Sequence, residues 1–439
     1  MKSNHPETEL LKKSPLIMDA VIMYCCTRLV RDGYRDIGSV LHNVYAKSDI
    51  SAHLKRESGE TAVSVLYGNA YCSSVKDAVE ALDMLGQYKV QNKYEAFAIL
   101  QYAFNPVRPR SKAGEILMEL VNDIVRSHKH PELSSIGHVS LKGDVMYCDE
   151  EFEVEMIDTV AHFTDVLTRV LESGDAAKNH IFYRGHSEAS FEMVPTLFRE
   201  ERWKRNEANM YCELLNTCPE DFAALPSHID RLTEMQHYGL PTRLLDITSN
   251  PLTALYFASN TNPKRNGEVI MLSVEGKKLK YAQSRTIAMV ASLPLMGYDN
   301  QMTMYSETSG DDYDNAIQAL MEEVNTERPG FVINNQMEKN MKEYYVVMPN
   351  RINRRVDRQE GAFIICGLME DFYGNERKPV RSAISDMRIR DSRGKKVLLM
   401  IQASKKKDIM LSLDKLGINK STLFPEIDDV ADDIKNKVR

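Results

Sequence analysis

Several common signals are missing from this chain of 439 residues. The seven cysteines are scattered, form no CxxC pair and lack nearby histidines at zinc-ligand spacing. The sequence therefore predicts free thiols in a reducing compartment, without a disulfide framework or a metal site. The longest apolar runs, such as 397–401, are far too short to cross a bilayer. Residues 1–13 are polar and do not resemble a signal peptide, so we expect a cytoplasmic protein that does not enter membranes.

Strong charge of one sign is also missing. The formal net charge of -7 gives no electrostatic reason for non-specific binding to DNA or to anionic lipid. Hydrophobic residues make up 43% and charged residues 27% of the chain, which is typical of globular proteins rather than disordered ones. A chain of this length exceeds what one hydrophobic core usually serves, so we expect more than one domain.

Apolar periodicity predicts a mainly helical accessory domain over residues 1–150, which we expect to recruit a protein partner. Residues 116–125, for example, repeat apolar side chains on one face of a helix. Segment 137–153 looks like a linker or a small hairpin that leads into a second domain.

Strands and helices are mixed in the second domain, over residues 155–436. The pattern predicts helices at 156–171, 251–258 and 405–416, and strands at 180–185, 242–246, 267–274, 344–349, 362–366 and 396–401. Segment 276–342 has a different composition and is interpreted as an insertion, partly helical around 314–324. Strands this far apart, with few βαβ alternations, favour an α+β fold with a central, mostly antiparallel sheet.

Two short stretches concentrate the side chains that suit chemistry. In the first, Tyr183-Arg184-Gly185 ends an apolar strand, and the planar donor fork of arginine suits a phosphate or carboxylate. Gly185 would let ligand atoms approach the backbone. The alternative is that Arg184 pairs with a structural carboxylate such as Asp246.

The second stretch runs from Gln236 to Asp246 and turns tightly at 239–241. Strand alternation places Thr242 and Asp246 on one face and Arg243 on the other. Thr248 and Ser249 extend the polar set. His237, before the turn, is as compatible with a buried structural histidine as with a functional one.

A third element, at residues 350–363, places Gln359 and Glu360 just before a glycine and an apolar strand. Adjacent strand residues face opposite sides, so at most one of the two would point into a cleft. The arginines around them form either a solvated face or a basic cluster that attracts phosphate.

These motifs resemble the FRG-domain family, which is named after its (F/Y)-R-G triplet. The resemblance covers about 155–436 and rests on Tyr183-Arg184-Gly185, the 236–246 stretch, and Gln359, Gly361 and Phe363. The family occurs largely in bacteria, archaea and their viruses. A weaker likeness to ADP-ribosyltransferases implies an ADP-ribosyltransferase-like fold and an NAD site.

That likeness implies roles for particular residues. Arg184, Asp246, Gln359 and Glu360 would be catalytic, with Arg184 holding the NAD diphosphate or ribose. The residues implied to contact the nucleotide are Tyr183, Arg184, Gly185, His237, Thr242, Arg243, Thr248 and Ser249. Two hypotheses follow: an NAD-using transferase or toxin in phage defence, and a non-catalytic module that senses a nucleotide or modified nucleic acid.

Overall fold

The computed structural model describes residues 139–142, 145–148, 152–172, 178–189, 191, 193–350, 353–374 and 383–437. The predicted helical domain lies outside these residues, apart from an antiparallel hairpin of β1 (Val139–Lys142) and β2 (Val145–Cys148). Of the two interpretations of segment 137–153, the hairpin is therefore the one observed. The chain falls into two compact units, and the described part of the first holds β1, β2 and most of β3 (Phe152–Ile157).

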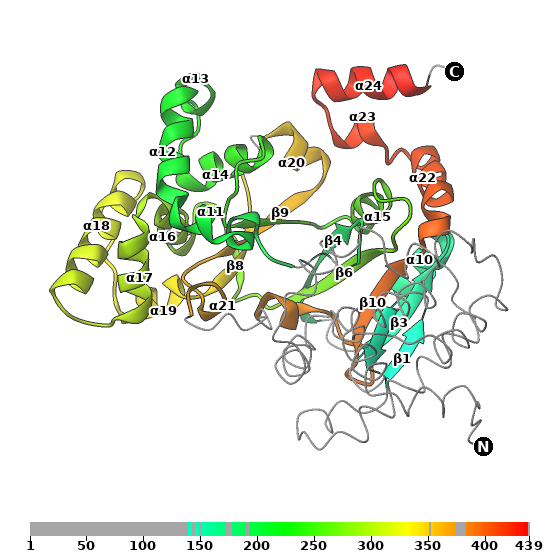
Figure 1. The fold of residues 1–439 in the computed structure, drawn as a ribbon, viewed down its shortest axis with the longest axis horizontal. Helices are drawn as coiled ribbons and strands as arrows, with labels where there is room; N and C mark the ends of the chain where they lie inside the picture. The colour runs from blue at the N-terminus through cyan, green and yellow to red at the C-terminus, as the bar shows by residue number, and fades with distance from the viewer. Residues whose placement is uncertain are drawn as a thin grey trace, which may run out of the picture. The chain divides into compact units, whose positions relative to one another are not determined.

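A mixed sheet forms the centre of the second unit (Figure 1), with strands in the order β10-β6-β4-β5-β9-β8-β7. Their bounds are β4 (His180–His186), β5 (Leu244–Thr248), β6 (Gly267–Val274), β7 (Leu279–Tyr281), β8 (Tyr344–Met348), β9 (Gly361–Cys366) and β10 (Lys396–Ile401). Neighbours pair antiparallel, except β7 with β8, which are parallel. The expected α+β fold with a mostly antiparallel sheet is confirmed.

The sheet is buried on both faces. On β6, Val269 and Met271 pack into one apolar cluster, while Ile270 and Leu272 pack into another on the opposite face. This follows from the period of two along a strand, and it explains why β6 reads as an almost continuous apolar run.

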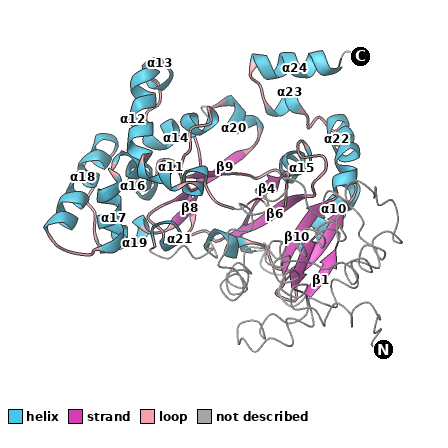
Figure 2. Cartoon of the chain, in the orientation of Figure 1, coloured by secondary structure: helices cyan, strands magenta, loops and turns pink. Residues whose placement is uncertain are grey.

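Helices cover the sheet (Figure 2). The helices that pack into the cluster with Val269 and Met271 include α10 (Val160–Leu171), α15 (Pro251–Ser259) and α22 (Lys406–Lys415), and Leu423 of α23 (Lys420–Leu423) joins them. The remaining helices are α11 (Glu201–Arg205), α12 (Glu207–Thr217), α13 (Pro219–Phe222), α14 (His228–His237), α16 (Arg285–Ser292), α17 (Tyr298–Ser306), α18 (Asp311–Glu327), α19 (Asn335–Met341), α20 (Arg354–Arg358), α21 (Glu370–Tyr373) and α24 (Ile427–Lys437). In the part of the chain that the structure describes, no helix is both long and apolar enough to span a membrane.

One local prediction needs correction, and a second gains detail. The helix expected from residue 156 begins at Val160, because Met156 and Ile157 complete β3 and Thr159 caps the helix. Segment 276–342 contains β7 and four helices, and one of these, α18, covers the helix expected around 314–324. Its side chains Ile287, Leu320 and others pack with α12 and α14 in a shared core, so this segment is part of the packed structure of its unit.

Candidate functional site

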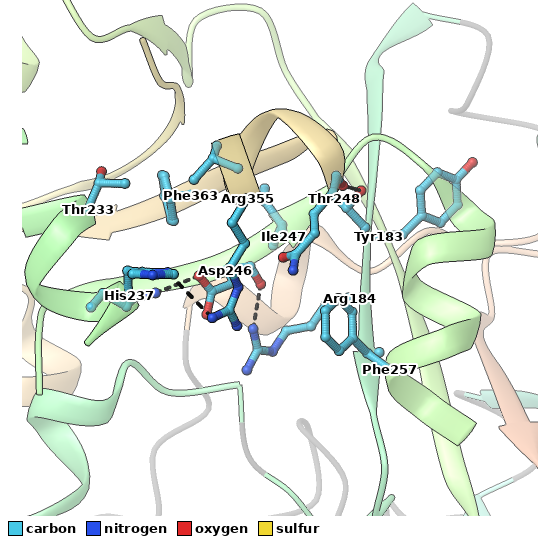
Figure 3. Close-up of a pocket in the computed structure, with 14 residues that line it drawn as sticks. Tyr183, Arg184, Thr233, His237, Asp246, Ile247, Thr248, Phe257, Arg355 and Phe363 are labelled. Atoms are coloured by element: carbon cyan, nitrogen blue, oxygen red, sulfur yellow. Dashed lines mark hydrogen bonds between the residues drawn. The ribbon is translucent and has the colours of Figure 1, made fainter. Parts of the chain in front are cut away.

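Three sequence motifs meet on adjacent strands. Arg184 lies on β4, Asp246 on β5, and Gln359 just before β9, and β5 is the strand between the other two. A cavity of about 210 Å³ opens over this region (Figure 3). Its lining includes Tyr183, Arg184, Gly185, His237, Asp246, Thr248 and Gln359 from the predicted set. Thr242, Arg243, Ser249 and Glu360 do not line it.

The cavity lies where two strands part. β4 pairs with β6 along its whole length, but its register with β5 consists of Tyr183 opposite Thr248. Beyond this pair, the Nη1 of Arg184 donates a hydrogen bond to the backbone carbonyl of Asp246 (Figure 3). The guanidinium therefore satisfies a carbonyl at the position where the β-ladder stops.

Gly185 is required by packing. A Cβ built on Gly185 would lie 2.0 Å from the carbonyl oxygen of Ala254 and 2.7 Å from the nitrogen of Ala258, both in the backbone of α15. The sequence suggested that this glycine admits ligand atoms. The structure places α15 against β4 at this position, a close approach that only glycine permits. Gly185 also lines the cavity, so the expectation that it admits ligand atoms stays a prediction.

A helix end positions the 236–246 stretch. Gly239 has a φ of 83°, its N–H donates to Gln236, and the N–H of Leu240 donates to Met235. These two bonds form a Schellman motif, which ends α14 at His237. The last turn of α14 thereby directs both Gln236 and His237 to the cavity.

A neutral side chain holds the Asp246 carboxylate. The Nε2 of Gln236 donates to Oδ1 of Asp246 at 2.6 Å, and the hydroxyl of Thr242 donates to Oε1 of Gln236. Thr242 is buried and outside the lining, so its contribution to the cavity is to orient Gln236. The Asp246 carboxylate is thus fixed in place while its charge is left uncompensated by these contacts.

The Arg184 guanidinium is likewise held by hydrogen bonds to groups without charge. Its Nε donates to Nε2 of His186 at 2.9 Å, so both of its hydrogen bonds go to neutral acceptors. Burial lowers the pKa of Arg184 to about 10; Asp246 opposes this shift and Arg199 adds to it. The guanidinium is still protonated at neutral pH, and it contacts the backbone of Asp246 rather than its carboxylate.

Arg243 lies elsewhere, with a fully buried guanidinium. Its Nε donates to Oε1 of Glu207 at 2.9 Å, and its Nη2 bonds the other carboxylate oxygen. The Nη1 donates to the carbonyl of Cys366 at 3.0 Å. Although burial favours the neutral form, Glu207 raises the pKa of Arg243. These contacts give Arg243 a structural role in joining α12 to the sheet.

Of the neighbours Gln359 and Glu360, Gln359 alone lines the cavity. The carbonyl of Gln359 accepts from the Thr248 hydroxyl at 2.7 Å, and its Nε2 donates to the carbonyl of Leu423. Glu360 is exposed and has a φ of 47°, a left-handed conformation that costs a glutamate roughly 1–3 kcal/mol. Its Oε1 accepts from Nδ2 of Asn250 at 2.9 Å.

Ser249 belongs to the same contact, because its N–H donates to the carbonyl of Glu360 at 3.0 Å. Asn250 is the N-cap of α15. Glu360 and Ser249 thus secure the start of α15 instead of facing the cavity.

Sequence reasoning missed further lining residues, among them Gln236, Phe257, Arg355 and Phe363. Gln236 lies inside the second motif, so its position next to His237 was an available signal. Arg355 is one of four arginines between positions 351 and 358, for which the sequence allowed either a solvated face or a cluster that attracts phosphate. Among the described residues, no group of three or more histidine, cysteine or acidic side chains is arranged to hold a metal ion.

Comparison with known proteins supports the first two motifs. Residues 179–267 match the family model of the FRG domain, a range that runs from just before β4 to the first residue of β6. The third motif, at 359–363, lies outside the matched range. No curated protein and no solved structure matches the chain.

Proposed function

Because the chain carries an FRG domain, with the YRG triplet on the cavity wall, we propose that this domain is an NAD-using enzyme with ADP-ribosyltransferase-like chemistry. One observation carries the proposal. Arg184 and Asp246 line the same cavity, yet each is held by neutral partners, so neither charge neutralises the other through an ion pair. A substrate with an anionic part and a carbon that becomes cationic suits both groups.

The reaction assigns a separate task to each group. Arg184 would bind the diphosphate, for which its donor fork is suited. As the bond between nicotinamide and ribose C1′ breaks, the electron pair leaves with nicotinamide and positive charge develops at C1′. The Asp246 carboxylate would stabilise that charge, as carboxylates do in glycoside hydrolysis. Water or a nucleophilic acceptor group then attacks C1′ and loses its proton to solvent.

The rest of the lining fits part of a dinucleotide. Phe257 is half-buried on the lining and supplies aromatic surface for a flat ring. The volume of about 210 Å³ is below the roughly 300–1,000 Å³ of sites that enclose a drug-sized ligand. We therefore expect the cavity to enclose the nicotinamide-ribose half, with the adenosine half outside it.

The test uses purified full-length protein and NAD. Nicotinamide release is measured first, and transfer of an adenine-labelled ADP-ribose group to lysate proteins second. Asp246→Asn should lower kcat by roughly a hundredfold or more, the size of effect seen when one preorganised electrostatic group is removed. Asp312→Asn, at an exposed position on α18, is the matched control. Release at the wild-type rate by Asp246→Asn would overturn the assignment.

A second candidate is a nucleotide-sensing module without catalysis. The location of Glu360 favours it, because this carboxylate of the third motif lies outside the cavity. The module would bind nucleotide without releasing nicotinamide, and Arg184→Gln would reduce affinity alone. For the NAD-using enzyme we propose a role as a toxin in phage defence. Expression of wild-type protein should arrest cell growth if NAD is consumed, whereas expression of Asp246→Asn should not.

A further inference from the structure

Arg355, on α20, is a second cationic group on the cavity wall. We infer that Arg355 and Arg184 together bind a ligand with two adjacent phosphates, which makes a nucleoside diphosphate or a dinucleotide the preferred ligand class. The inference rests on the proposed function in that both concern the same cavity. It assigns a role to one particular arginine of the 350–363 element and adds a ligand selectivity that the sequence motifs do not contain.

The contacts of Arg355 leave its charge available. Its Nη1 lies 3.4 Å from Nδ1 of His237, and its guanidinium carbon lies 4.6 Å from the ring centre of Phe424. Among the described residues, no carboxylate forms an ion pair with Arg355, although the buried Arg243 has one. A half-buried cation held by an imidazole and an aromatic face gains stability when an anion arrives.

The C-terminal segment orients this arginine. Phe424 stacks against Arg355 and also meets Phe257 edge to face, with ring centres 6.0 Å apart. The preceding residue, Leu423, is buried and accepts the hydrogen bond from Gln359. Phe424 thus contacts two residues of the cavity wall and acts as a positioning residue for Arg355.

His237 completes the support from the other side. Its Nε2 lies 3.5 Å from Oε1 of Glu426, and its Nδ1 lies on the side of Arg355. The Glu426 carboxylate therefore contacts His237, and the Arg355 guanidinium remains on the cavity lining.

Two guanidiniums on separate walls favour a bridging ligand. Figure 3 shows the side chains of Arg184 and Arg355 both directed toward Asp246, one from β4 and the other from α20. Each guanidinium can donate two parallel hydrogen bonds to one phosphate. A diphosphate reaches both arginines, whereas a monophosphate engages one of them fully.

The experiment compares the affinities of ADP and AMP by isothermal titration of the full-length chain. Wild-type protein should bind ADP at least tenfold more tightly than AMP. Arg355→Gln should weaken ADP binding by roughly tenfold to a hundredfold, the loss of a charge-assisted hydrogen bond, and should change AMP binding little. Phe424→Leu should reduce the selectivity in the same direction but by less. Arg358→Gln, exposed on the same helix, is the control and should bind as wild type does.

The outcomes separate the two proposals. If wild-type protein binds neither ADP nor NAD, the proposed function and the inference both fail. If wild-type protein consumes NAD but Arg355→Gln keeps the full preference for ADP, only the role of Arg355 is overturned. Should Arg355→Gln not fold, Arg355→Lys, which keeps the charge and loses the fork, replaces it. Unchanged selectivity in that variant overturns the inference equally.

Discussion

The buried pair of Arg243 and Glu207 yields the sharpest prediction about stability. Glu207→Gln removes the negative charge and leaves a fully buried guanidinium with only neutral partners. Removing one partner of a buried ion pair typically costs about 3–5 kcal/mol. Because domains of ordinary stability unfold with roughly 5–15 kcal/mol, the variant should lose a large part of its folded population in mild denaturant.

Urea denaturation measures the effect, with the fluorescence of Trp203 as the probe. Trp203 is the single tryptophan of the chain and lies four residues before Glu207. Glu213→Gln, at an exposed position of the same helix α12, is the control and should stay within about 0.5 kcal/mol of wild type.

A double variant tests whether the cost is electrostatic. Glu207→Leu with Arg243→Met removes both charges and should be less destabilised than Glu207→Gln alone, because no unpaired charge remains. If Glu207→Gln loses less than about 1 kcal/mol, the buried pair does not have the importance assigned to it. The folded fraction of Glu207→Gln should bind nucleotide as wild type does, since neither member of the pair lines the cavity.

Three further predictions concern the cavity and its surroundings. Gly185→Ala should destabilise the protein by about 3 kcal/mol in denaturant titrations, because the new methyl group meets the Ala254 backbone; wild-type stability would contradict this. Burial lowers the pKa of His228 to about 4 from 6.5, so the unfolded chain takes up a proton that the folded chain refuses as pH falls through this range. Up to about 3 kcal/mol of stability should be lost between pH 6.5 and 4, and His228→Gln should show a correspondingly flatter pH profile of unfolding. Gln236→Met should lower NAD turnover by roughly tenfold to a hundredfold because Asp246 loses its hydrogen-bond donor, while KM changes less; equal kcat would refute this.

Elements with local signals were predictable from the sequence. Asn250 followed by Pro251 is a cap and a first-turn proline, and α15 begins there. The run 267–274 is apolar and β-branched, and it forms β6 with those bounds. Segment 276–342 was harder because α16 is buried along most of its length and its residues show little polar alternation.

The site residues likewise divide into those that a local pattern predicts and those that depend on tertiary structure. Strand alternation correctly separates Arg243 from Asp246, since a period of two needs no tertiary information. The choice between Gln359 and Glu360 required the position of α15, because Asn250 at its N-cap binds Glu360. The role of Arg355 depends on Phe424, about seventy positions later, and no local pattern links residues so far apart.

The single register pair between β4 and β5 has a thermodynamic consequence. In an unbroken ladder the backbone N–H and C=O groups of β4 and β5 would hydrogen-bond to one another. Here the carbonyl of Asp246 accepts from the side chain of Arg184 instead. A ligand that binds in the cavity contacts both β4 and β5 and therefore stabilises the sheet where the two strands separate. Ligands of this protein should therefore raise its melting temperature, and a thermal-shift survey of nucleotides offers a direct route to its substrate.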